Sequence, residues 1–250
     1  MRAQVLDFAV ELVSRQGLTV GLGHLSFDEI IQTAGVSRTT AYRVWPRKER
    51  FLEDLLRRLA DVTSPCYGPL DDESSEVGFA VLNGHIDKLG TSAGRKMVLV
   101  EVARTISTHW REGASASPKW RTYLALIATM RSLGNEELAD DLCSRLQAVD
   151  NAAVEHLAAL YQQALTVLGY RVRDLSMSQL VHTCGATLMG AMLLAEHRPE
   201  MTVPVINIDP FDTGRSADWA LASIAYTATL LAAIEPDPDY NLEAALSSLN

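Results

Sequence analysis

The strongest constraint on the fold is a pair of short segments, each with apolar residues on one helical face, joined by a glycine turn. They lie in LSFDEIIQTAGVSRTTAYRVWP, residues 25–46. Ser26 begins a Ser-x-x-Glu pattern that caps a helix N-terminus, and Gly35 follows the last apolar position as a stop. Ser37 precedes the second segment, which Pro46 must end because its ring cannot continue the hydrogen-bond ladder. The spacing predicts two helices that meet at a tight turn, which is the helix-turn-helix arrangement.

Two longer amphipathic segments flank this pair. Residues 2–16 carry apolar side chains at every third or fourth position and are followed by Gly17, which predicts a first helix. After Pro46, a stripe of Phe and Leu side chains over residues 51–59 predicts a fourth helix. We therefore expect residues 1–60 to form a helix-turn-helix DNA-binding domain in which the fourth helix leads to the rest of the chain.

The second helix of the motif lies in a stretch of unusual charge. The protein has a formal net charge of −9, yet residues 36–51 include five Arg or Lys. Residues 1–60 hold nine Lys and Arg against seven Asp and Glu, whereas the remaining residues hold 13 against 24. Because an acidic body repels nucleic acid and a basic corner attracts it, this asymmetry is typical of a protein that presents one end to a polyanion.

The residue types on this helix suit DNA. Arginine makes forked hydrogen bonds to guanine or phosphate, and threonine donates to bases or packs its methyl group against thymine. The candidates for base recognition are Arg38, Thr39, Thr40 and Arg43. Ser26 offers a hydroxyl and a helix N-terminus to a phosphate. The alternative is a small helical corner whose charged face is only solvated, and Arg47 and Arg50 fit that interpretation better.

A capping serine, an Ala-Gly-Val-Ser turn, a tyrosine, an aromatic residue three positions later, a lysine and a hydrophobic pair follow one another in this stretch. They are Ser26, Ala34 to Ser37, Tyr42, Trp45, Lys48, Phe51 and Leu52. This order resembles the DNA-binding domain of the TetR family of bacterial transcriptional regulators. The resemblance covers about the first 60 residues. Trp45 stands where the family usually has Phe, and the loop before Ser26 is longer than is typical.

The resemblance implies roles for individual residues. Tyr42 and Lys48 would contact the DNA backbone, although Tyr42 could instead close the domain core, as we expect of Trp45. The full set of expected DNA-contacting residues is Ser26, Ser37, Arg38, Thr39, Thr40, Tyr42, Arg43 and Lys48. The resemblance also implies a homodimer and, by default, a repressor that a small-molecule effector releases from a palindromic double-stranded DNA operator.

Residues 61–250 are expected to form a larger helical domain that binds the effector and dimerises. Helical patterns cover about 75–90, 94–110, 118–132, 136–168, 176–197 and 215–234, with breakers near 64–73, 113–118 and 199–214. No alternating strand pattern of convincing length is present. The expected fold class is therefore all-α, with a three-helix DNA-binding domain joined by a fourth helix to the larger domain.

The last two of these segments mix apolar with small residues, which allow close helix approach. In a TetR-like protein the corresponding helices form a four-helix bundle between two subunits, and such a dimer fits half-sites roughly 34 Å apart. The residues expected at this interface are Leu188, Met192, Ile224 and Ala228. The alternative is that this surface is core within one chain.

The middle helices hold aromatic, apolar and isolated polar residues of the kinds that line ligand pockets. The residues expected to line an effector pocket are Met97, Glu101, Arg104, Trp110, Tyr123, Met130 and His156. Glu101 lies in the apolar run MVLVEVARTI, which is compatible with a buried carboxylate. Its alternative is an ordinary pair with Arg104 or a solvated face.

No enzyme motif is recognisable: the chain lacks Gly-x-Ser-x-Gly, His-Glu-x-x-His, Cys-x-x-Cys and a complete phosphate loop. Cys66, Cys143 and Cys184 are far apart in sequence, so we expect reduced, mostly buried thiols and neither a metal site nor a cofactor. No apolar run reaches the ~20 residues of a membrane span, and no signal-peptide cleavage site follows the first segment, which predicts a cytoplasmic protein.

The function favoured by the sequence is a TetR-like, ligand-responsive transcriptional regulator. The alternative is a helical ligand-binding or interaction protein without DNA binding. The longer loop before Ser26, and a start at the first helix without the basic arm that some members place in the minor groove, keep this alternative open.

Overall fold

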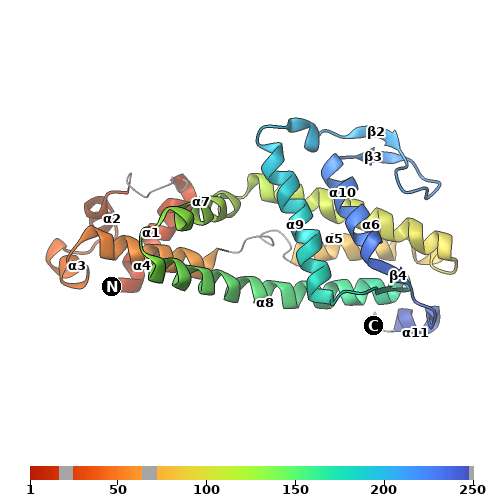
Figure 1. The fold of residues 1–250 in the computed structure, drawn as a ribbon, viewed down its shortest axis with the longest axis horizontal. Coiled ribbons are helices and arrows are strands. Elements are labelled where there is room, and N and C mark those ends of the chain that lie inside the picture. Colours follow the sequence, from red (N-terminus) through yellow and green to blue (C-terminus); the bar gives the residue numbers. More distant parts are fainter. Residues whose placement is uncertain (17–24, 64–71, 248–250) are drawn as a thin grey trace. The chain divides into compact units, whose positions relative to one another are not determined.

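The computed structural model describes residues 1–16, 25–63 and 72–247, and over these residues the protein is predominantly helical, with eleven α-helices and four short strands (Figure 1). The chain divides into two compact units. We call residues 1–68 and 116–153 the N-terminal unit, and residues 69–115 and 154–250 the C-terminal unit. None of the described helices has the length and hydropathy that a bilayer span requires.

The N-terminal unit is built from short and medium helices around one apolar core. Its elements are α1 (Arg2–Gln16), α2 (Phe27–Thr33), α3 (Arg38–Val44), α4 (Lys48–Val62), α7 (Pro118–Ser132) and the first part of α8 (Glu136–Leu168). The four helices predicted before residue 63 are confirmed. The sequence predicted a domain boundary after residue 60, whereas residues 116–153 group with the N-terminal helices, because Leu126 of α7 and Leu142 of α8 lie in the same hydrophobic cluster as α1 and α4.

The turn between α2 and α3 is set by backbone hydrogen bonds. Gly35 has φ +71°, and its N–H donates to Gln32 O at 3.1 Å. The N–H of Val36 donates to Ile31 O at 2.9 Å. These two bonds make a Schellman motif, which needs a left-handed residue at the position of Gly35. Glycine adopts that conformation without steric cost because it has no Cβ, which explains why the predicted turn forms at Gly35.

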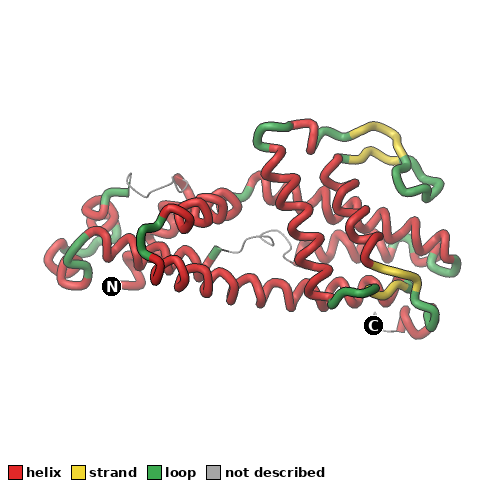
Figure 2. The backbone as a smooth tube through the Cα atoms, in the orientation of Figure 1, coloured by secondary structure: helices red, strands yellow, loops and turns green. Residues whose placement is uncertain are grey.

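The C-terminal unit combines helices with two antiparallel strand pairs (Figure 2). Its helices are α5 (Asp72–Asn83), α6 (Ser92–Ala116), the rest of α8, α9 (Met177–Ala195), α10 (Leu221–Ala233) and α11 (Leu242–Ser247), with 3₁₀ turns at Ile86–Lys88 and Pro199–Met201. Strand β1 (Tyr170–Val172) pairs with β4 (Ile234–Pro236), and β2 (Val205–Ile208) pairs with β3 (Ala217–Trp219). Helices α9 and α10 pack closely against one another.

Three expectations need correction here. The four strands were missed because three or four residues are too few to show an alternating pattern. The segment predicted as one helix over 215–234 begins instead with β3, and its helix starts at Leu221. The helix predicted over 94–110 continues through Gly113 to Ala116, so the break expected over 113–118 is confined to Ser117, between α6 and α7. A single glycine in a helix costs only about 1 kcal/mol, which tertiary packing readily offsets.

Candidate DNA interface and ligand cavity

Helix α3 is anchored by one residue and exposed elsewhere. Ala41 is the buried residue of this helix, with 0% of its surface accessible. Ser37, Arg38, Thr39, Tyr42 and Arg43 are exposed, and Thr40 is half-buried. The two further predicted contacts, Ser26 and Lys48, are half-buried at the starts of α2 and α4. All eight predicted DNA-contacting residues therefore keep accessible surface.

The end of α3 is held by an aromatic cluster. Trp45 is 1% exposed and packs edge-on against Phe27 and Phe51, with ring centroids 6.0 and 5.4 Å away. Its indole N–H donates to Asp54 Oδ2 at 2.6 Å. The prediction that Trp45 closes the domain core is confirmed. The ring of Tyr42 meets the Phe27 ring edge-on at 5.3 Å while 41% of the residue stays exposed, so Tyr42 packs partly against the core and its contact with the DNA backbone stays a prediction.

Serine caps begin both helices of the motif. Ser26 Oγ accepts from Glu29 N at 3.3 Å, and Ser37 Oγ accepts from Thr40 N at 3.2 Å. The serine half of the predicted capping box at α2 is confirmed. The complete box, with both reciprocal bonds, occurs at α9 between Ser176 and Gln179.

A carboxylate that the sequence did not single out lies beside the predicted DNA contacts. Asp28 Oδ2 is 3.4 Å from an Arg38 guanidinium nitrogen, and the Tyr42 hydroxyl donates to Asp28 Oδ1 at 3.3 Å. Asp28 is half-buried on the first turn of α2. In the free protein, Asp28 therefore binds both Arg38 and Tyr42, two residues that the sequence predicts to contact DNA.

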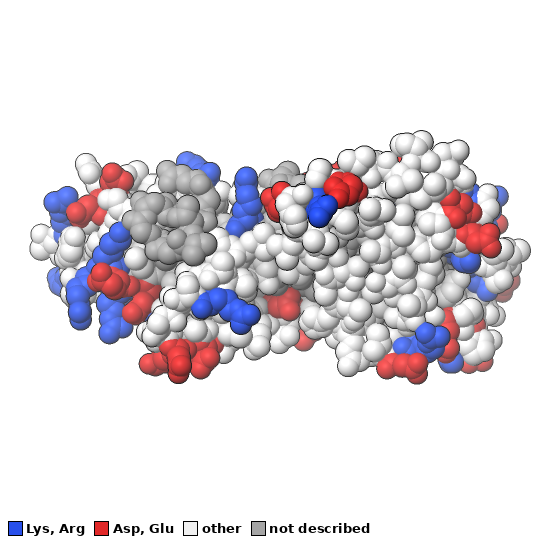
Figure 3. Space-filling model, turned by 45° about the horizontal axis from the view of Figure 1, so that its top comes forward, with Lys and Arg blue, Asp and Glu red and all other residues white. Residues whose placement is uncertain are grey.

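Of the remaining basic residues of this region, Arg50 pairs with Glu53 at 3.0 Å, whereas the other three have no ion-pair partner within the described ranges. Among the residues that the structure describes, Arg43, Arg47 and Lys48 make no ion pair within 4.0 Å. Figure 3 shows Lys and Arg side chains gathered over the N-terminal helices, with acidic side chains between them. Arg43 is thus an unpaired cation on the exposed face of α3.

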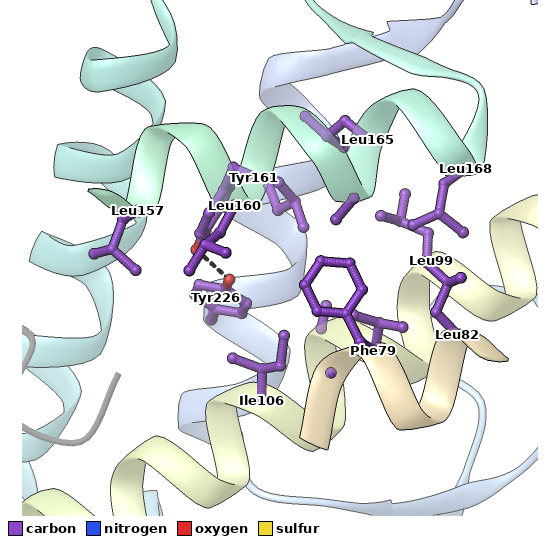
Figure 4. A pocket seen from close by; sticks show the side chains of 15 residues that line it. Phe79, Leu82, Leu99, Ile106, Leu157, Leu160, Tyr161, Leu165, Leu168 and Tyr226 are labelled. Carbon is purple, nitrogen blue, oxygen red and sulfur yellow. Dashed lines mark hydrogen bonds between the residues drawn. The ribbon is translucent and has the colours of Figure 1, made fainter. Parts of the chain in front are cut away.

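A cavity of about 70 Å³ lies inside the C-terminal unit, between α5, α6, α8 and α10 (Figure 4). Its polar groups are the hydroxyls of Tyr161 and Tyr226, which are hydrogen bonded to each other. The residues that line it are Gly78, Phe79, Leu82, Leu99, Val102, Ala103, Ile106, Leu157, Leu160, Tyr161, Ala164, Leu165, Leu168, Tyr226 and Leu230.

This cavity includes none of the seven residues predicted to line an effector pocket. Tyr123 and Met130 belong to the N-terminal unit, where Met130 packs against the hydrophobic core. Trp110 is buried on α6, Met97 is half-buried on the same helix, and His156 is exposed on α8. The predicted residues miss this cavity because the prediction favoured aromatic and isolated polar side chains, whereas the cavity is lined mainly by aliphatic ones.

Glu101 and Arg104 form an ordinary ion pair. Their carboxylate and guanidinium are 2.6 Å apart on one turn of α6, as the alternative interpretation of Glu101 expected. Burial acts to raise the pKa of Glu101, but the hydrogen bonds and charge of Arg104 outweigh it, so this pKa lies below its ordinary value. Glu101 is therefore a paired structural carboxylate.

The actual lining residues follow plain apolar stripes. On α6 they recur as Leu99, Val102, Ala103 and Ile106, which is the i, i+3, i+4, i+7 spacing of one helical face. On α8 the stripe extends from Leu157 to Leu168. Such stripes also describe a filled core, so the sequence carries no signal that separates a cavity wall from packed interior.

The predicted dimer residues divide between core and surface. Leu188 and Met192 are 5% and 4% exposed, so for them the intrachain alternative is correct. Ile224 is half-buried and Ala228 is exposed on α10. Helices α9 and α10 contain no Asp, Glu, Lys or Arg, and Figure 3 shows a broad face without charged side chains over them.

Comparisons with protein-family models, with curated proteins and with solved structures found no match. Cys184 is buried, whereas Cys143 is exposed, so the expectation of buried thiols is wrong for Cys143; Cys66 lies outside the described residues. Within the described ranges, no three His, Cys, Asp or Glu side chains gather as they would around a metal ion.

Proposed function

We propose that this chain is a TetR-like DNA-binding transcriptional regulator, by default a repressor that a small-molecule effector releases from a palindromic operator. The observation that carries the proposal is the exposure of α3. A seven-residue helix with Arg38, Thr39 and Arg43 on its surface, fixed through buried Ala41 and Trp45, has the form of a recognition helix.

The chemistry of this face favours a nucleic-acid duplex over an acidic protein. Arginine and threonine together distinguish bases by forked hydrogen bonds and by methyl contacts with thymine. Lys48 follows α3 at the start of α4, where it would meet a phosphate and set the register of the helix.

The uncharged face of α9 and α10 supports a two-fold dimer. Charged residues are depleted at the centre of protein–protein interfaces. On α10 Ala228 is exposed and Ile224 is half-buried, and Leu193 and Leu194 of α9 are each 46% exposed. A two-fold dimer would match a palindromic operator with half-sites about one helical turn apart.

Effector release would follow from linkage. If a ligand favours a dimer spacing that does not fit the two half-sites, DNA must weaken ligand binding by the same factor. A coupling of ~1–3 kcal/mol corresponds to a ~5- to 150-fold loss of operator affinity. The cavity of the C-terminal unit is the candidate site for this ligand.

The experiment is selection of a duplex from a random library with the full chain, followed by fluorescence anisotropy at several salt concentrations. We expect the binding constant to fall steeply with salt, in proportion to the phosphates neutralised. Arg43→Ala should abolish preference for the selected duplex. Arg121→Ala removes an equally exposed cation from α7 and should leave that preference unchanged. Failure to enrich any duplex, with the chain folded, would favour a ligand-binding protein without DNA binding.

A further inference from the structure

We propose that the cavity of the C-terminal unit takes an uncharged, mostly apolar, single-ring molecule with one hydroxyl or carbonyl group, which hydrogen-bonds to the Tyr161–Tyr226 pair. That this molecule acts as the effector rests on the proposed function. The binding itself can be tested without DNA.

The lining excludes an ionised ligand. None of the fifteen residues around the cavity carries a charge, and thirteen of them have no polar side-chain atom. A carboxylate or ammonium moved from water to such a site would lose its hydration with no counter-ion in return. The carbon skeleton of the ligand must therefore be apolar and its net charge zero.

The two tyrosines provide the single polar point. Tyr161 comes from α8 and Tyr226 from α10, and Figure 4 shows their hydroxyls meeting at one side of the cavity. Tyr226 is 3% exposed, and burial raises its pKa, so the phenol stays neutral. Burial likewise raises the pKa of the adjacent Cys184 thiol, a hydrogen-bond partner of Tyr161, to about 12. A neutral phenol both donates and accepts, which suits a hydroxyl or carbonyl, and it carries no charge that would balance that of an ion.

The cavity is too small to hold a single ring without some movement of its lining. A cavity of about 70 Å³ is smaller than the ~150 Å³ engineered cavity that holds benzene. A single ring must therefore push lining side chains aside. Ile106 already fills the space beside Gly78, because a Cβ added to Gly78 would lie 2.6 Å from Ile106 Cδ1.

The tyrosine pair connects this movement to the uncharged face. Tyr226 belongs to α10 and Cys184 to α9, the two helices through which we propose dimerisation. A ligand hydroxyl that inserts between Tyr161 and Tyr226 replaces a bond between α8 and α10. The bound ligand would thereby favour a different position of α10, which is the differential contact that effector linkage requires.

The test is isothermal calorimetry on the full chain with three probes of similar size: p-cresol, toluene and benzoate. We expect p-cresol to bind about tenfold more tightly than toluene, because it gains one hydrogen bond, and benzoate to show no binding. The double variant Tyr161→Phe, Tyr226→Phe should bind p-cresol and toluene equally. Binding of benzoate as tight as that of p-cresol would overturn the inference.

A matched pair of variants on α8 locates the site. Ala164→Leu fills the cavity and should abolish p-cresol binding, whereas Ala159→Leu places the same side chain on the exposed face and should preserve it. Circular dichroism and thermal unfolding confirm that both fold. If Ala164→Leu folds and still binds p-cresol, the cavity is not the site. If the unsubstituted chain binds a selected duplex but not p-cresol, this inference alone is refuted, whereas binding of p-cresol by a chain that selects no duplex would refute the regulator and leave the ligand class standing.

Discussion

Asp28→Asn should strengthen DNA binding. The substitution keeps the shape of the side chain and removes the charge that lies 3.4 Å from the Arg38 guanidinium. If Arg38 leaves Asp28 to contact DNA, the protein loses that pair on binding. Exposed pairs are worth about 0.2–1 kcal/mol, and the Arg38 and Asp28 side chains are 72% and 42% exposed. In Asp28→Asn the unbound protein has no such ion pair to break, so its affinity for DNA should rise by up to about fivefold per protomer, or about 30-fold for a two-fold dimer.

The assay is fluorescence anisotropy of the selected duplex and of an unrelated duplex at fixed salt. Glu29→Gln is the matched control, because it removes the same charge from the same turn of α2 and Glu29 makes no ion pair among the described residues. We expect Asp28→Asn to gain more affinity than Glu29→Gln. Weaker binding of Asp28→Asn to the selected duplex would refute this reasoning and indicate that Asp28 itself accepts a hydrogen bond from cytosine N4.

Three further predictions concern the fold and assembly. Gly35→Ala should destabilise the N-terminal unit by about 1–2 kcal/mol in urea unfolding, because φ +71° is costly for any residue with a Cβ although no atom crowds that position. Hydrogen bonds from Arg57 and Arg145 lower the pKa of Asp141 below its ordinary value of 3.8. The Asp141 carboxylate therefore stabilises the fold above pH 3.8, and this stabilisation is lost as the pH falls through the folded-state pKa. The destabilisation caused by Asp141→Asn, measured by urea unfolding, should be smaller at acid pH than at pH 7. Ala228→Arg should give a monomer in sedimentation, whereas Gln163→Arg on exposed α8 should not, and an unchanged dimer in Ala228→Arg would place the interface elsewhere.

Local signals predicted the N-terminal helices well. A capping serine, a left-handed glycine and a proline each act within a few residues, so Ser26, Gly35 and Pro46 fix where α2 and α3 begin and end. The exposed face of α3 follows from the same spacing. These features need no knowledge of the rest of the chain.

Long-range features could not be predicted in this way. Asp28 meets Tyr42 across fourteen positions, and nothing near Asp28 in sequence announces the contact. The Tyr161–Tyr226 pair spans 65 positions. Leu188 and Met192 are buried on α9, which packs against α10, and their burial depends on how the helices pack. The cavity depends on an imperfect fit among four helices, and apolar stripes alone do not reveal that misfit.

The claim that α3 enters the major groove is tested most directly by dimethyl sulfate protection of guanine N7 on the selected duplex. We predict protected guanines in two half-sites about one helical turn apart, with one protected position in each half-site lost in Arg43→Ala. Binding that leaves every guanine N7 reactive, or a protection pattern that Arg43→Ala does not change, would contradict the proposed role of α3.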